Sequence, residues 1–255
     1  EAERATIGSH IRNILPLVDG EKVETVLALR SLEADGYFVF ATRNGLIKRT
    51  EIREYGNINA AGLVAINLLD GDELISVRIA DGKADIVLGT RRGQAIRFTE
   101  EDVRPTGRAT QGVIGIRLRE GDEVVSMAVI QEADKPLAEL LSVSESGLGK
   151  RTHLSEYPLQ GRGGQGVIGH KLSERTGGVV SLNQVLGTEE LFVLSESGDL
   201  IRTKVDGVSL YGRSSQGVTI KRIDDGDRVV AAMVLPSDES LATAPLPGPQ
   251  PGSAD

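Results

Sequence analysis

The chain has 255 residues, with 29 lysines and arginines against 37 aspartates and glutamates, which gives a formal net charge of −8. This excess of acid excludes nucleic-acid binding through bulk charge, so any such role needs a local basic face. Cysteine is absent, which excludes disulfides and thiolate sites, and no apolar run reaches the roughly 20 residues of a membrane helix. We therefore expect a soluble protein of the cytoplasm.

The first segment predicts an incomplete unit of a repeated structure. Residues 1–30 contain RATIG, which lies one repeat length before a similar segment ending in Gly62, but no hairpin precedes it. We interpret 1–30 as a partial first repeat and expect residues upstream of Glu1 in the natural protein.

Four full repeats of about 50 residues are predicted next, over 37–80, 85–130, 140–186 and 191–235. Each opens with a short apolar run, a turn containing glycine and a basic stretch, which predicts a buried strand followed by a tight hairpin. The turn glycines are Gly45, Gly93, Gly147 and Gly198.

A second recurring feature of the repeat, here called the landmark segment, follows each hairpin and predicts a further strand. The landmark glycines are Gly8, Gly62, Gly112, Gly166 and Gly217. An acidic turn and another apolar strand then complete the unit. Four strands per repeat predict an all-β fold of blades arranged radially. The last segment, 236–255, is rich in proline, serine and acids and predicts a disordered tail.

Basic residues recur at three positions of the repeat, and a localised basic rim is the hypothesis that they support. Four residues before the landmark glycine stand Arg4, Arg108, Arg162 and Arg213. Four residues after the turn glycine stand Arg49, Arg97, Arg151 and Arg202, with Lys48 and Lys150 beside two of them. Five residues after the landmark glycine stand Arg117, Lys171 and Arg222. The alternative for any one of them is a solvated strand face that discourages edge pairing.

Other motifs give no catalytic or metal site. Gly161, Gly163 and Gly166 match a dinucleotide-binding fingerprint literally, but no helix is predicted after them. The acidic turns lack the remaining ligands of a calcium loop, and the three histidines occupy different repeat positions. Tyr55, Tyr157 and Tyr211 are interpreted as packing anchors.

These repeats, and above all YPLQGRGGQGVIG, resemble the C-terminal domain of the DNA gyrase A protein over roughly 1–235. The family's hallmark loop reads QRRGGKG or close to it, and Gln160, Arg162, Gly163, Gly164 and Gly166 fit that pattern. Gly161 and Gln165 replace basic residues, so the loop resembles a second, weaker copy, with the principal one expected upstream.

The resemblance implies a β-pinwheel, six-bladed in the intact family domain, with strands exchanged between blades and duplex DNA wrapped around its basic edge. It implies no sequence specificity and no cofactor in this domain, with ATP and Mg²⁺ used elsewhere in the enzyme. The implied DNA contacts are Arg162, Gly163, Gly164, Gln165 and Gly166 and the three basic series. The implied partners are the N-terminal breakage-reunion part of the gyrase A protein and the gyrase B protein, in a bacterial, nucleoid-associated heterotetramer that introduces negative supercoils.

Two alternatives to the interpretation as a DNA-wrapping gyrase domain stay open. The corresponding domain of topoisomerase IV recognises DNA crossings and has fewer blades and a degenerate loop. A protein-interaction propeller of the WD40 type is the alternative from a different class, but its Trp-Asp signature is missing, since the chain contains no tryptophan.

Overall fold

The computed structural model describes residues 13, 15, 17, 18, 20–29, 31–58 and 62–236. Arg4 and Gly8, most of the predicted partial repeat and the tail beyond Pro236 lie outside this part of the chain. Within it, no helix is long and apolar enough to cross a membrane.

Four antiparallel hairpins form the centre of the fold, one for each predicted full repeat. Their strand pairs are β1 (Tyr37–Thr42) with β2 (Leu46–Glu51), β4 (Asp85–Thr90) with β5 (Gln94–Thr99), β8 (Glu139–Ser144) with β9 (Leu148–His153), and β12 (Glu190–Ser195) with β13 (Leu200–Lys204). The turn glycine adopts a positive φ in all four, for example 84° at Gly45, a conformation that other residues rarely adopt. A short 3-10 helix follows the second strand: η2 (Ile52–Tyr55), η3 (Glu100–Asp102), η4 (Leu154–Glu156) and η5 (Val205–Gly207).

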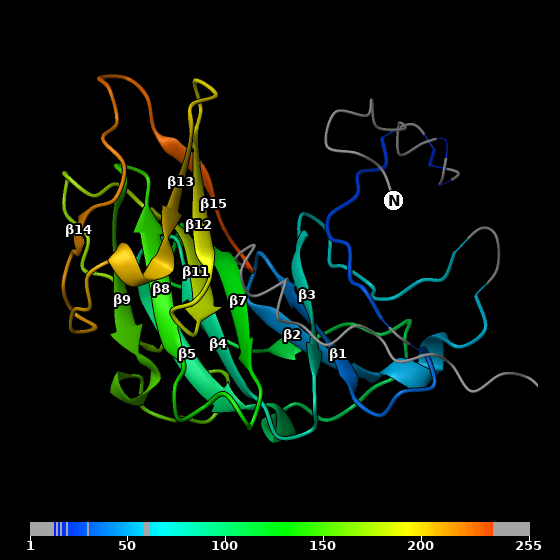
Figure 1. Cartoon of the computed structure of the whole chain (residues 1–255). Helices are drawn as coiled ribbons and strands as arrows, with labels where there is room; N and C mark the ends of the chain where they lie inside the picture. The colour runs from blue at the N-terminus through cyan, green and yellow to red at the C-terminus, as the bar shows by residue number, and fades with distance from the viewer. Residues whose placement is uncertain are drawn as a thin grey trace, which may run out of the picture.

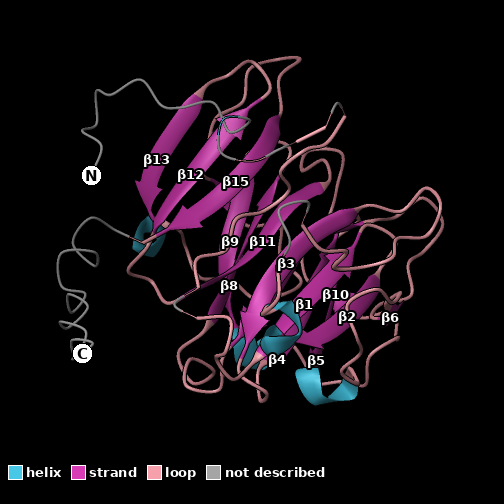
Figure 2. Ribbon diagram, turned by 90° about the vertical axis from the view of Figure 1, so that its right-hand side faces the viewer, coloured by secondary structure: helices cyan, strands magenta, loops and turns pink. Residues whose placement is uncertain are grey.

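The inner strand of each sheet pairs with the first strand of its hairpin and comes from the end of the same repeat. These strands are β3 (Leu74–Ala80), β7 (Val124–Ile130), β11 (Val179–Val185) and β15 (Val229–Leu235). Neighbouring inner strands pack on one another, β3 with β7, β7 with β11 and β11 with β15. The sheets consequently follow each other around an arc, from β1–β3 to β12–β15 (Figures 1 and 2).

The outer strand of a sheet comes from the next repeat in the chain, so neighbouring blades exchange strands. These strands are β6 (Val113–Ile114) on β2, β10 (Val167–Ile168) on β5 and β14 (Val218–Thr219) on β9. They complete three four-stranded sheets, whereas the described part of the last sheet has three strands, β13-β12-β15.

The landmark segments form strands of only two residues each, and the segment 62–68, where a strand was also predicted, forms none. The cause is visible at β6, which pairs only with Leu46 and Ile47 because the hairpin turn begins immediately beyond them. The next amides, of Gly115 and Ile116, donate instead to the carbonyl of Gly45 in that turn. The landmark segment therefore ends against a turn and cannot extend the ladder.

Apolar cores lie between successive blades. One buried cluster joins residues of the first and second repeats around Phe98 and Ile116, and two others join the second with the third and the third with the fourth. A fourth cluster covers the free face of the first sheet, where Leu27 and Leu29 pack near Phe38 and Phe40. The described end of the N-terminal segment thus contributes to the apolar packing beside the first sheet.

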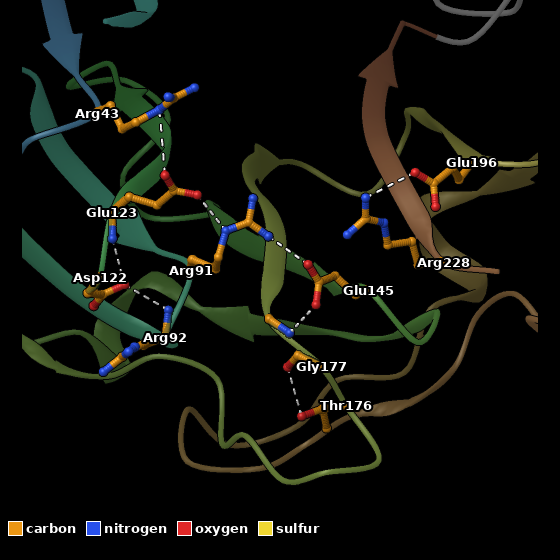
Figure 3. A network of polar contacts seen from close by, with 11 residues as sticks. Arg43, Arg91, Arg92, Asp122, Glu123, Glu145, Thr176, Gly177, Glu196 and Arg228 are labelled. Carbon is orange, nitrogen blue, oxygen red and sulfur yellow. Dashed lines mark hydrogen bonds and ion pairs between the residues drawn. The ribbon is translucent and has the colours of Figure 1, made fainter. Parts of the chain in front are cut away.

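A chain of ion pairs crosses the blades beside the hairpin turns, at the ends of the inner strands (Figure 3). Arg43 contacts Glu73 of its own repeat and Glu123 of the next, at 2.6 and 3.5 Å. Arg91 likewise contacts Glu123 and then Glu145 of the third repeat, at 2.5 and 2.6 Å. The charges are reversed in the last blade, where Arg228 on the inner strand side contacts Glu196 on the hairpin at 3.0 Å.

Candidate nucleic-acid interface

The rim of the molecule is built where the landmark segment of one repeat lies along the loop of the next. The residue five positions after the landmark glycine makes the same backbone contact each time. Its N–H donates to a loop carbonyl: Asn67 to Thr110 at 3.0 Å, Arg117 to Gly164 at 2.8 Å and Lys171 to Ser215 at 3.0 Å. The repeat therefore delivers one side chain per blade to corresponding places beside successive loops.

Three predicted cations at this position have exposed side chains. They are Arg117, Lys171 and Arg222. None of the three side chains has an ion pair or hydrogen-bond partner among the described residues. In the first full repeat the position is Asn67, whose side-chain amide donates to the carbonyl of Ala109 at 2.9 Å. Exposed guanidinium and ammonium groups without a partner are the groups that phosphate oxygens can pair with.

The loop arginines Arg162 and Arg213 fold back onto the preceding blade in the same way. The Nε of Arg162 donates to the carbonyl of Asp102 at 2.8 Å, and its Nη1 donates to the carbonyl of Ile114 at 3.1 Å. Arg213 uses the equivalent carbonyls, those of Glu156 and Ile168. Arg162 stays exposed, so its guanidinium holds the loop in place and also faces solvent at the rim. Arg108, the third described member, is half-buried and has no such contact among the described residues.

The loop glycines fall into two groups. A Cβ on Gly161 would meet nothing within 4 Å, and at Gly163 and Gly164 the nearest atoms lie at 3.5 and 3.4 Å. At Gly166, by contrast, a Cβ would collide with the carbonyl of Ala95 in the preceding blade, and at Gly217 with that of Gly149. The landmark glycine thus has a packing role, while the loop before it, with exposed Gln165, stays open to a ligand.

The second basic series is engaged in contacts between blades. Arg97 pairs with Asp85 at 2.6 Å and donates to the carbonyls of Leu154 and Tyr157 in the next repeat, at 3.0 and 3.1 Å. Arg151 pairs with Glu139 at 2.9 Å and donates to the carbonyls of Val208 and Asp206.

The two ends of this series differ from the middle. Buried Arg49 pairs with Glu100 of the next repeat at 2.9 Å and stacks on the ring of Tyr37. Arg202 in the last blade is half-exposed and pairs with Glu190 at 2.5 Å. The first three arginines therefore join each hairpin to the region of the next repeat's 3-10 helix, and their contact with DNA stays a prediction.

Lys48 and Lys150 lie beneath the loops of the following repeats. Lys48 is 1% exposed and its Nζ donates to Thr50 and to the carbonyls of Ala65 and Arg108 at 2.7 to 2.8 Å. Lys150 is fully buried and donates to the carbonyls of Gly212 and Arg213. Burial lowers the pKa of each ammonium to about 8. In this conformation both lysines support the loops, and neither is accessible to a phosphate.

Some exposed residues were not singled out from the sequence. Arg104, Arg119 and Arg175 are further exposed cations without a side-chain partner among the described residues. The aliphatic residue two positions after the landmark glycine is also exposed, at Val64, Ile114 and Ile168. The recurrence of an aliphatic residue at this position of the repeat is visible in the sequence and could have indicated a shared role. Within the described residues, no group of three or more histidine, aspartate or glutamate side chains is placed to hold a metal ion.

The matching family model is described as the DNA gyrase C-terminal domain, beta-propeller, and it matches four segments, 36–81, 84–131, 138–185 and 189–236. The chain belongs to the DNA gyrase C-terminal domain family. Each matched segment contains one hairpin and its inner strand. The match therefore agrees with the all-β blade architecture.

Curated relatives carry the name of the DNA gyrase A protein. The protein of Deinococcus deserti is 52% identical over 244 residues, which is 94% of this chain and 30% of that protein. The protein of Staphylococcus epidermidis is 41% identical over 230 residues, 90% of this chain and 26% of that protein. The chain thus spans less than a third of the length of these relatives.

Two solved structures share the fold. A DNA gyrase A C-terminal domain matches with a TM-score of 0.77 and 31% identity, over 88% of this chain and 74% of that one. The C-terminal domain of a DNA topoisomerase IV matches with a TM-score of 0.83 and 26% identity, over 92% of this chain and 74% of that one. The backbone is therefore common to both enzymes.

Proposed function

We propose that this gyrase-family domain binds duplex DNA without sequence preference along its rim, bends it and wraps it with a fixed handedness. In this role it is a non-catalytic part of a type IIA topoisomerase that introduces negative supercoils, together with the remainder of the gyrase A protein and the gyrase B protein. Cleavage and ATP hydrolysis belong to those other parts. Its place is the bacterial cytoplasm.

One observation supports the proposal most directly. A chain with a net charge of −8 presents exposed, unpartnered cations at the same place on successive blades, Arg117, Lys171 and Arg222, with no partner among the described residues. Contacts of this kind bind the phosphate backbone and carry no sequence information. Their spacing around an arc suits a bent duplex, whose smooth deformation costs on the order of 1–6 kcal/mol that the contacts have to offset.

A salt titration of duplex binding tests the proposal. The slope of log affinity against log salt is expected to become shallower by about 0.9 for each phosphate contact removed, so R117Q/K171Q/R222Q reduces it by up to about 2.7. K83Q is the matched control, because Lys83 is exposed in the turn between β3 and β4, away from the landmark loops. An unchanged slope in the triple variant contradicts the proposal.

Wrapping is tested separately by ligating nicked plasmid with the protein bound. A shift of the topoisomers in one direction supports chiral wrapping, and an unchanged distribution contradicts it.

The similarity to a topoisomerase IV domain favours recognition of DNA crossings as the second candidate function. Preferential binding to supercoiled over linear DNA, without a topoisomer shift, supports that candidate instead.

A further inference from the structure

Aliphatic side chains recur on the basic rim at one position of the repeat, two residues after the landmark glycine. Val64 is 60% exposed, and Ile114 and Ile168 are each 45% exposed. Thr219 occupies the position in the last blade and is also exposed. All four residues are β-branched, and three of them end the outer strands β6, β10 and β14.

The cores do not require these side chains. The residue two positions further along, such as Ile116, is the one that enters the core between blades. Exposed aliphatics on an outer strand invite pairing with other chains, and proteins usually place charges there. A single exposed aliphatic needs no explanation, but exposure at equivalent places on successive blades indicates a shared contact.

Cations flank each of these isoleucines in the same geometry. The carbonyl of Ile114 accepts from Arg162 of the next repeat, and the carbonyl of Ile168 accepts from Arg213. Three residues beyond the isoleucines stand the exposed Arg117 and Lys171. An aliphatic group between two cations is complementary to a DNA strand, on which each apolar deoxyribose lies between two phosphates.

We propose that Ile114 and Ile168 pack against deoxyribose in the bound duplex and supply a part of the affinity that does not depend on salt. The inference rests on the proposed DNA binding and adds a second kind of contact to it. Phosphate contacts release counterions and weaken as salt rises. Burial of an aliphatic group against sugar releases none.

The test replaces both isoleucines by the residue that the last blade already has, in I114T/I168T. We expect about a fivefold loss of duplex affinity for each replaced isoleucine, equal at every salt concentration, with an unchanged slope. I114V/I168V is expected to retain nearly all the affinity, because valine keeps most of the apolar contact. L137T is the matched control, since Leu137 is 75% exposed but lies in the loop after β7, away from the landmark loops.

The outcomes separate this inference from the proposed function. If the wild-type chain binds no duplex, both are overturned. If wild type binds and the triple cation variant changes the slope, but I114T/I168T binds as wild type does, only the sugar contact is overturned. A change of the salt slope in I114T/I168T also overturns the sugar contact. Analytical ultracentrifugation tests another occupant of the aliphatic surface: if the variant changes from dimer to monomer without loss of DNA affinity, the surface binds a second copy and the sugar contact is overturned. Thermal unfolding followed by circular dichroism checks that each variant is folded.

Discussion

Lysine and isoleucine alternate at one position of the repeat, three residues after the turn glycine: Lys48, Ile96, Lys150 and Ile201. The first three are buried beneath the loop of the next repeat. The sequence shows the lysines beside arginines and therefore suggests one basic patch. Adjacent residues on a strand point to opposite faces, so the separation of each lysine from its arginine neighbour follows from the predicted strand. The burial of the lysines could not be predicted, because a lysine stem packs as an aliphatic chain and its burial depends on the loop that covers it.

The lowered pKa of Lys150 predicts a particular dependence of stability on pH. Below pH 8 the ammonium is charged in both states and burial destabilises the fold. From about pH 8 to 10.5 the unfolded chain binds more protons, so Lys150 makes stability rise with pH. Urea unfolding of wild type and K150M at several pH values should show wild type gaining about 2–3 kcal/mol relative to the variant over this window.

Other groups around Lys150 are Glu156, Arg213 and His170, which both variants retain. Their contributions largely cancel in the difference between wild type and K150M. Parallel pH profiles would contradict a lowered pKa at Lys150.

At the scale of elements, the hairpins and inner strands follow directly from the sequence, because apolar runs of strand length end at turn glycines and acidic turns. The outer strands could not be predicted in length. Their pairing stops where the neighbouring hairpin turns, and that neighbour belongs to another repeat.

The landmark glycine gives a prediction for these outer strands. G166A is expected to lower the free energy of unfolding by about 2 kcal/mol or more, because φ is 73° and a Cβ would collide with Ala95. G161A, five residues earlier, should change it by less than about 0.5 kcal/mol, since its Cβ would meet open space. Equal stability of the two variants, measured by urea unfolding, would show that the close approach is not required.

The ion pair between Arg49 and Glu100 joins β2 to the 3-10 helix of the next repeat. R49M is expected to destabilise the protein by about 3 kcal/mol at pH 7, because it leaves Glu100 fully buried and charged. Burial raises the pKa of Glu100 while Arg49 opposes that rise, so the loss in R49M should shrink on acidification as the carboxyl becomes protonated. R202M, at the equivalent and half-exposed position, should lower the free energy of unfolding much less. An equal loss of stability in R49M and R202M, or a loss in R49M that does not depend on pH, would exclude the buried charge of Glu100 as the cause.

At the scale of the whole molecule, the ion pairs that cross the hairpin turns couple one blade to the next (Figure 3). Gly178 stands where the first two repeats have Glu73 and Glu123, and a Cβ there would lie 2.8 Å from the side chain of Arg91. The absence of a side chain lets Arg91 lie close to Glu145, whose carboxylate also accepts from the Gly178 amide at 2.7 Å.

A double-mutant cycle of R91Q and E145Q should measure this coupling. We expect about 0.5–1 kcal/mol at low salt and less at high salt, since both side chains are partly exposed. The matched pair Arg53 and Asp35, with side chains 61% and 94% exposed, should couple by close to zero. Additive effects of R91Q and E145Q in urea unfolding would contradict a link between blades.

Strand exchange has a consequence for how this protein can be divided. A cut between two repeats removes the outer strand from the sheet before it, so one deletion damages two blades. Grafts, truncations and circular permutations that respect the repeat boundaries of the sequence will therefore expose an unpaired outer edge on the sheet before the cut. A cut placed just after a landmark segment, such as behind Ile168, leaves the preceding sheet whole.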